Sequence, residues 1–371
     1  MNTRGLRKTF LELLDINSPS RNEKGVARYV KAALKSVADE FTEDRAGEAI
    51  EGNANNLVFR LRGSRDGAPP LVLVSHMDTV EPTPRLRLER RGTVVRSDGT
   101  TVLGADDKAG IAVMIEAARA LAGRRRAFGT VEFVFSVAEE VGLLGIEHLD
   151  CGLIEGRLGL VLDSNTPVGS IVTAAPSSDH IEVRIKGRKA HAGVEPEKGI
   201  NAITVAAKAI ARLRQGRLDE ETTANIGVIE GGTATNIVPD EVRVRGEARS
   251  FSERKLARWV AHARSTFLKA AEAAGAEAQI ETKRAFTTYD VPRRHSLVRA
   301  VAKAARAIGR RSTLLRSGGG SDANVLNGHG IASVVLGMGY KDPHTKQESI
   351  DLVELDAAAR WVLGIVEALG R

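Results

Sequence analysis

Short apolar runs alternate with longer amphipathic stretches along much of this chain. Continuous runs such as Leu71 to Ser75 and Ile331 to Leu336 predict strands buried on both faces, as in parallel sheets. Apolar residues at helical spacing, as in residues 352–369, predict amphipathic helices between such strands. Strands that alternate with helices indicate an α/β domain with a mixed, mostly parallel sheet sandwiched by helices.

The pattern changes near Pro176. Residues 179–187 alternate between polar and apolar side chains, as in an antiparallel strand with one solvated face. The stretch that follows, up to Arg284, has the order β-α-β-β-α-β, which is typical of a small two-layer α+β domain. The expected domains are therefore a larger one, residues 1–176 and 288–371, and an inserted lid or dimerisation domain, residues 177–287.

Two local signals refine this pattern. Ser20 and Glu23 form an S-x-x-E capping box just before a helical stretch that begins near Val26. Ser97-Asp-Gly-Thr100 predicts the turn of a hairpin.

Composition narrows the class of protein. Apolar residues make up 42% and aromatic residues 4% of the 371 residues, so the core must be aliphatic. Cys151 is the single cysteine, which excludes an intrachain disulfide. No apolar run approaches the ~18 residues of a membrane span, and the first residues lack the apolar segment of a secretory signal. We therefore expect a cytoplasmic protein without a membrane partner.

The net charge of +7, from 54 basic and 47 acidic residues, raises the question of nucleic-acid binding. The basic residues are scattered, apart from the run Arg124-Arg125-Arg126, and few aromatic residues are present for base stacking. A solvated basic surface is the better interpretation, and we expect no nucleic-acid partner.

Polar side chains with metal-binding chemistry follow the predicted strands. Each pair has an ordinary structural explanation when taken alone; adjacent aspartates, for example, can cap a helix. Mixed imidazole and carboxylate ligands suit zinc, and also cobalt or manganese. Five ligands suffice for two ions if one carboxylate bridges them. The candidates are His76 and Asp78, Asp106 and Asp107, Glu139 and Glu140, Asp163, and His344.

Three motifs in this order resemble a known family. They are Ser75-His-Met-Asp-Thr79, Gly104-Ala-Asp-Asp-Lys-Ala-Gly110 and Glu139-Glu-Val-Gly142. The resemblance is to the dinuclear-zinc exopeptidases, which include peptidase T, aminoacylase, glutamate carboxypeptidase and succinyl-diaminopimelate desuccinylase. It covers nearly the whole chain and is strongest to the peptidase T-like subgroup.

The resemblance implies two divalent metal ions, zinc first, with cobalt or manganese as alternatives. His76 and Asp163 would hold one ion, Glu140 and His344 the other, and Asp106 would bridge them.

The resemblance also implies the catalytic residues. Asp78 would orient His76, and Glu139 would be the general base. His191 would reach the active site of the partner subunit in a homodimer formed through the inserted domain. The contacts to a substrate carboxylate would come from Asn236, Arg249, Gly318, Gly319 and Gly320.

The expected function is hydrolysis of amide bonds in short peptides by a di- or tripeptide aminopeptidase. An N-acyl-amino-acid amidohydrolase or a carboxypeptidase is the alternative. A catalytically silent scaffold would be expected to lack the base or a ligand, and the chain has both. For Arg249, pairing with a neighbouring carboxylate such as Glu247 remains an alternative to substrate binding.

Overall fold

The computed structural model describes residues 1–65, 67–123 and 128–370, so the run Arg124-Arg125-Arg126 lies outside the described residues. The chain forms two compact units. Unit 2 is Ala175–Tyr289 together with Gly318–Gly320, a tripeptide that is remote from it in sequence. Unit 1 is Met1–Ala174, Asp290–Ser317 and Ser321–Arg371.

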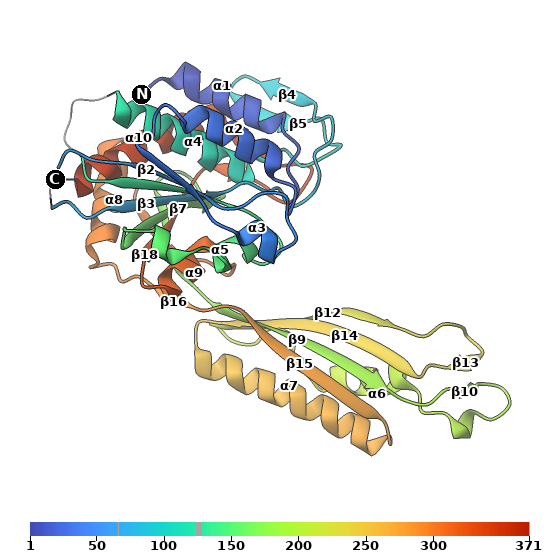
Figure 1. Ribbon diagram of the computed structural model, residues 1–371. Helices are drawn as coiled ribbons and strands as arrows, with labels where there is room; N and C mark the ends of the chain where they lie inside the picture. Colours follow the sequence, from blue (N-terminus) through green and yellow to red (C-terminus); the bar gives the residue numbers. More distant parts are fainter. Residues whose placement is uncertain (66, 124–127, 371) are drawn as a thin grey trace. The chain divides into compact units, whose positions relative to one another are not determined.

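A nine-stranded sheet forms the centre of unit 1, in the order β1-β2-β6-β3-β7-β18-β8-β16, with β17 paired to β8 (Figure 1). The central strands β6, β3, β7 and β18 run parallel, and β1 and β2 pair antiparallel at one edge. Every residue of β3 and β6 is buried, as their apolar runs predict. The strands are β1 (Glu40–Glu43), β2 (Leu57–Leu61), β3 (Leu71–His76), β6 (Val131–Ser136), β7 (Leu158–Ser164), β8 (Ser170–Ala175), β16 (Tyr289–Asp290), β17 (Thr313–Arg316) and β18 (Ala332–Gly337).

Helices cover both faces of this sheet (Figure 1). On one face α4 packs on β3 and β7, and α1, α2 and α10 pack on α4. On the other face α9 packs on β7 and β18. The fold class expected from the sequence is confirmed. The helices are α1 (Thr3–Leu14), α2 (Lys24–Leu34), α3 (Ala46–Ala49), α4 (Ala105–Ala122), α5 (Leu144–Glu147), α8 (Ser296–Ala307), α9 (Asp322–Gly328) and α10 (Leu352–Leu369). Among the described residues, no helix is both long and apolar enough to span a bilayer.

A second sheet of unit 1 corrects the predicted hairpin. β4 (Leu88–Arg91) and β5 (Val94–Ser97) pair through a turn at Gly92, whose φ is 63°. Ser97 is the last residue of β5, and the Asp98–Thr100 turn leaves the hairpin instead of closing it. β5 then pairs with β20 (Ser349–Asp351), which pairs with β19 (Tyr340–Lys341).

Unit 2 is a five-stranded antiparallel sheet, ordered β11-β12-β14-β9-β15, with α6 and α7 packed against it. Ile181, Val183 and Ile185 of β9 join the apolar core shared with these helices, while the residues between them are more exposed. This alternation is what the sequence pattern predicts. A separate ribbon pairs β10 (Ala190–His191) with β13 (Ile237–Val238). The other elements are β9 (Ser177–Lys186), α6 (Ala202–Ile210), β11 (Gly216–Arg217), β12 (Thr222–Gly231), β14 (Glu241–Ser250), α7 (Glu253–Ala273) and β15 (Glu277–Phe286).

Candidate metal centre

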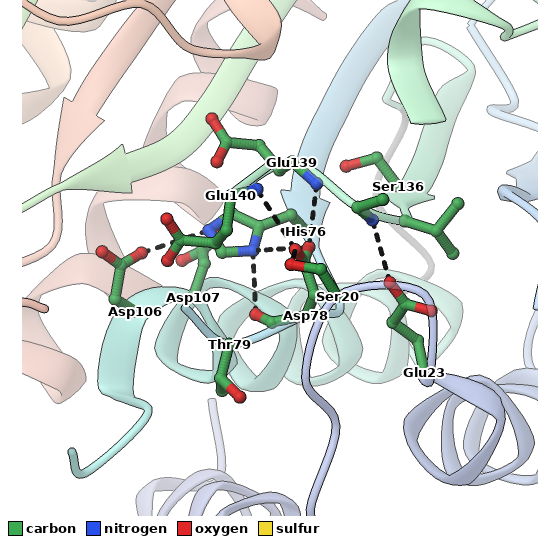
Figure 2. Close-up of polar contacts among 12 residues, drawn as sticks. Ser20, Glu23, His76, Asp78, Thr79, Asp106, Asp107, Ser136, Glu139 and Glu140 are labelled. Carbon is green, nitrogen blue, oxygen red and sulfur yellow. Dashed lines mark hydrogen bonds and ion pairs between the residues drawn. The ribbon is translucent and has the colours of Figure 1, made fainter. Parts of the chain in front are cut away.

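The candidate centre lies at the edge of the large sheet where β3, β6 and β7 end. His76 is the last residue of β3, Asp163 lies near the end of β7, and Glu139 and Glu140 follow β6. Because these strands are parallel neighbours, their carboxyl ends share one edge. Asp106 enters from the first turn of α4 (Figure 2).

Asp106 presents one carboxylate oxygen to each of two imidazoles. Its Oδ1 is 3.1 Å from His76 Nε2, and its Oδ2 is 3.3 Å from His344 Nε2. Asp163 Oδ1 lies 3.7 Å from the same His76 nitrogen. Glu140 Oε2 lies 3.1 Å from the His344 nitrogen. The five predicted ligands thus form two groups joined by Asp106.

The carboxylates of this cluster would be stabilised by a positive charge among them. Hydrogen bonds to Asp106 and Glu140 raise the pKa of His344 to about 10. Burial raises the pKa of Asp163 to about 7, and the neighbouring charge of Asp106 adds to this shift. Glu140 Oε1 is buried and, among the described residues, has no hydrogen-bond partner. Several oxygen and imidazole donors, one of them unsatisfied, fit divalent cations well.

Asp107 has a different role from its neighbour. Its carboxylate accepts hydrogen bonds from Ser75 Oγ (2.5 Å) and from the backbone amide of Gly110 (3.2 Å). Asp106 and Asp107 have non-helical backbone angles, so the regular part of α4 starts after them. Although Asp107 lies within 4.8 Å of ligand atoms of His76 and Asp163, its carboxylate caps the helix. Of the two aspartates, Asp106 is the better candidate for a ligand.

Two residues at this centre were not identified from the sequence. Tyr340 Oη lies 3.3 Å from Asp106 Oδ1 and 3.0 Å from Asp163 Oδ1. Glu348 accepts the backbone amides of Gly104 (2.7 Å) and Asp106 (2.9 Å). Both residues lie four positions from His344, and that proximity is the only sequence signal they carry.

Asp78 is placed to orient both His76 and the glutamates. Its carboxylate lies 3.3 Å from His76 Nδ1, and its backbone oxygen lies 3.0 Å from the same nitrogen. The two carboxylate oxygens also accept the backbone amides of Glu139 (3.0 Å) and Glu140 (3.1 Å). Burial alone would raise the pKa of Asp78, but the hydrogen bond and charge of His76 hold it below its usual value.

The predicted capping box is wrong. Ser20 Oγ donates to Asp78 Oδ2 at 2.6 Å, and Glu23 Oε1 accepts the backbone amides of Arg21 (2.7 Å) and Ala138 (2.9 Å). Glu23 occupies the N-cap position of α2 but makes no side-chain capping bond. Tertiary contacts therefore override the local capping pattern, because both side chains bond to residues around the candidate centre instead (Figure 2).

His191 and Asn236 are neighbours in unit 2. His191 pairs with Ile237 in the β10–β13 ribbon, and the amide of Ala192 donates to Asn236 O at 2.9 Å. The His191 side chain is exposed and accepts a hydrogen bond from the amide of Gly193. Both residues thus belong to one solvated corner of the insertion.

Arg249 is engaged within unit 2. Its Nε and Nη2 each donate to a different oxygen of Glu247 at 3.0 Å, which is the pairing considered as the alternative from the sequence. Its Nη1 donates to Gly318 O at 3.2 Å. The glycine segment therefore offers Arg249 an acceptor at Gly318, and Gly320 packs on the ring of Phe286. Gly319 also belongs to this segment, which groups with unit 2.

Two known family patterns match parts of this chain. The peptidase dimerisation domain pattern matches residues 174–274, and the peptidase family M28 pattern matches residues 56–150. Each match covers only part of the chain.

Solved structures match the whole chain. Aminopeptidase PepT from Bacillus cereus ATCC 10987 is 41% identical with a TM-score of 0.92, covering 100% of both chains. A tripeptidase from Staphylococcus aureus subsp. aureus Mu50 is 37% identical with a TM-score of 0.95, covering 100% of this chain and 99% of its own. The YxeP protein of Bacillus subtilis, a dinuclear metal-binding peptidase of the M20 family, shares the fold at 20% identity and a TM-score of 0.75, covering 99% and 97%.

Proposed function

This chain belongs to the peptidase T-like M20 metallopeptidases, and on that premise we propose that it is a metal-dependent aminopeptidase of di- and tripeptides. The observation that carries the proposal is Asp106, with one carboxylate oxygen toward His76 and the other toward His344. This arrangement suits a carboxylate that bridges two ions. The PepT aminopeptidase and the tripeptidase, similar over the full length, support the substrate class.

We propose zinc as the resident metal, with cobalt or manganese as alternatives. His76 and Asp163 would hold one ion and Glu140 and His344 the other, with Asp106 shared. When bound, the ions supply Lewis-acid polarisation of the scissile carbonyl and lower the pKa of the attacking water.

The proton of the attacking water would be transferred by residues of the chain itself. Burial raises the pKa of Glu139 well above its usual value, so its ionised carboxylate is a strong proton acceptor. Glu139 would take the proton of the attacking water on a carboxylate oxygen and deliver it to the leaving nitrogen. Asp78 orients His76 and holds the amide of Glu139, which fixes the base relative to the ligands.

We further propose that the enzyme acts as a homodimer. Residues 174–274 match a peptidase dimerisation domain. Arg249 lies near the end of β14, and the ribbon that carries His191 lies beyond its start. Arg249 lies eight residues after Glu241, which corresponds to roughly 26 Å at the rise of an extended chain. A tripeptide spans only about 10 Å. One bound tripeptide cannot reach both residues of a single chain, which favours a His191 that serves the partner's site.

Arg249 would bind the substrate's free carboxylate, with Gly318 to Gly320 of the same chain as further contacts. Asn236, the neighbour of His191, would come with that histidine from the partner chain. In the free protein Glu247 occupies two of its donors, so a substrate carboxylate would replace a carboxylate already held there. A free carboxylate is common to peptides and to N-acyl amino acids, and for this reason the amidohydrolase alternative needs a direct test.

Hydrolysis of matched substrates by the metal-loaded protein tests the proposal. We expect tripeptides and dipeptides to be cleaved from the amino end, with kcat/KM at least ~10²-fold above that for N-acetyl or N-succinyl amino acids. Amidating the tripeptide's carboxyl end should lower kcat/KM by ~10–100-fold, the loss of one charge-assisted contact. Arg249→Ala should remove most of that difference. Activity confined to N-acyl amino acids would establish the alternative function.

The proposed location is the cytoplasm. With Cys151 as its single cysteine, the fold needs no disulfide and suits a reducing compartment.

A further inference from the structure

The turn that carries Glu139 and Glu140 is held by side chains from outside it. Four successive backbone amides, from Val137 to Glu140, each donate to a buried side-chain oxygen. The acceptors are Asn56 Oδ1 for Val137 (3.0 Å), Glu23 Oε1 for Ala138 (2.9 Å) and Asp78 for Glu139 and Glu140. Asn56, Glu23 and Asp78 are all 0% exposed.

This backbone needs support because it is locally unfavourable. Ala138 has a φ of 50°, a left-handed conformation that residues with a Cβ rarely adopt. Its amide is the one that Glu23 accepts, and Glu139 follows directly. A left-handed residue immediately before the proposed base therefore depends on a carboxylate that comes from another part of the chain.

Glu23 makes this contact with Ala138 instead of capping its own helix. As the N-cap residue of α2 it could cap the helix, yet its Oε1 bonds to Arg21 and Ala138 instead. Among the described residues its Oε2 has no hydrogen-bond partner. One oxygen thus bonds two backbone amides, and the other is buried without compensation, which costs stability.

On the premise of the proposed peptidase, we propose that Glu23 is a positioning residue: it fixes the Ala138 amide and thereby aims Glu139 at the attacking water. Glu23 is absent from the candidate ligand set, and it acts only through the backbone of the turn. Ser20 supports the same turn indirectly, because its hydroxyl donates to Asp78 Oδ2 and Asp78 accepts the amides of Glu139 and Glu140 (Figure 2).

The test compares three variants of the full-length, metal-loaded protein. Glu23→Leu removes the acceptor and should lower kcat by ~10–100-fold with KM within ~2-fold, because misplacing a catalytic group impairs the chemical step. Glu23→Gln keeps an oxygen that can accept both amides, and should keep kcat within ~3-fold of the wild type. The matched control is Glu116→Leu, which removes a buried carboxylate that accepts the amide of Asn2 elsewhere in unit 1. This control should leave kcat within ~2-fold.

Two readouts do not depend on turnover. Metal content should be unchanged in all three variants. Hydrogen exchange of the segment 137–143 should speed up in Glu23→Leu and stay at the wild-type rate in Glu23→Gln and Glu116→Leu. If the wild-type protein cleaves no peptide, the proposed function fails, while the exchange result still decides the role of Glu23.

Several outcomes would overturn the proposal. They are a Glu23→Leu variant with kcat within 2-fold of the wild type, a Glu23→Gln variant as slow as Glu23→Leu, or equal losses in the Glu116→Leu control. If Glu23→Leu does not fold, Glu23→Asp replaces it. The shorter arm keeps the charge but cannot reach both amides, so unchanged kcat and exchange in that variant would also reject the role.

Discussion

Glu139 and Glu140 are adjacent in the chain, but their carboxylates point in different directions (Figure 2). The Glu140 side chain is 6% exposed and approaches His344. For Glu139, burial raises the pKa, the charge of His76 opposes this shift, and the charges of Asp163 and Asp322 add to it. The same residue type therefore has two different environments at consecutive positions. At the scale of single residues, this difference separates a candidate ligand from a candidate base.

The two glutamates should respond differently to the same substitution. Glu139→Gln should keep two bound metal ions while kcat falls by at least ~10²-fold, because only proton transfer is lost. Glu140→Gln should lose metal, since a neutral amide is a poorer ligand than a carboxylate. Elemental analysis and steady-state kinetics measure both effects. A metal-free Glu139→Gln, or one with near-normal turnover, would show that the roles are assigned wrongly.

At the scale of elements, the first turn of α4 is shaped by a residue far away in sequence. Gly104 has a φ of 78°, and Asp106 and Asp107 are non-helical, so the chain enters α4 through an irregular bend. Glu348 bonds the amides of Gly104 and Asp106 on this bend. With this bend in place, the carboxylate of Asp106 faces both imidazoles.

Glu348→Leu should therefore weaken metal binding by ~10–100-fold, the usual effect of losing a group that orients a ligand. Competition with a chelator measures the affinity, and circular dichroism reports whether the fold is kept. The control is Glu132→Gln, which changes a buried carboxylate that accepts the amides of Glu155 and Gly156 near the start of β6. Equal affinity in Glu348→Leu and the wild type would mean that Asp106 holds its position without this support.

At the scale of the whole molecule, the candidate chemistry is divided between two units. Unit 1 contains every predicted metal ligand, while His191, Asn236 and Arg249 belong to unit 2. Because Arg249 lies near the end of β14 and His191 lies in the ribbon that precedes the start of this strand, we expect that a single chain cannot present both residues to one short peptide. Two chains can do so if each lends His191 to the other.

Subunit mixing tests this sharing. His191→Ala and Glu139→Gln should each be nearly inactive as homodimers. After exchange, the heterodimer should contain one site with both residues intact and recover up to about half of the wild-type activity per site. Light scattering establishes the dimer, and a tagged subunit establishes the exchange. A monomer, or no recovery in verified heterodimers, would contradict the proposal.

Much of this architecture follows from the sequence alone. The spacing of apolar residues distinguishes the buried parallel strands from the half-solvated strands of the insertion. The first kind is buried on both faces and is apolar throughout, while the second is buried on one face and alternates. The sequence also predicts that the polar residues at the ends of β3, β6 and β7 lie close together, since parallel strands end at a common edge. His76, Asp106, Glu140, Asp163 and His344 do lie together at that edge.

Other contacts were decided only by the tertiary structure. The local sequence pattern predicts that Ser20 and Glu23 cap a helix, but Ser20 bonds to Asp78, 58 residues away, and Glu23 accepts the amide of Ala138, 115 residues away. Tyr340 and Glu348 carry no motif, and the bidentate pairing of Arg249 with Glu247 was only one of two open interpretations. The pattern of apolar and polar residues predicts which face of a helix or strand is buried, because burial repeats with the period of the backbone. The hydrogen-bond partner of a buried polar group depends on which distant segments pack beside it, since nearly every buried donor or acceptor is paired in the folded protein.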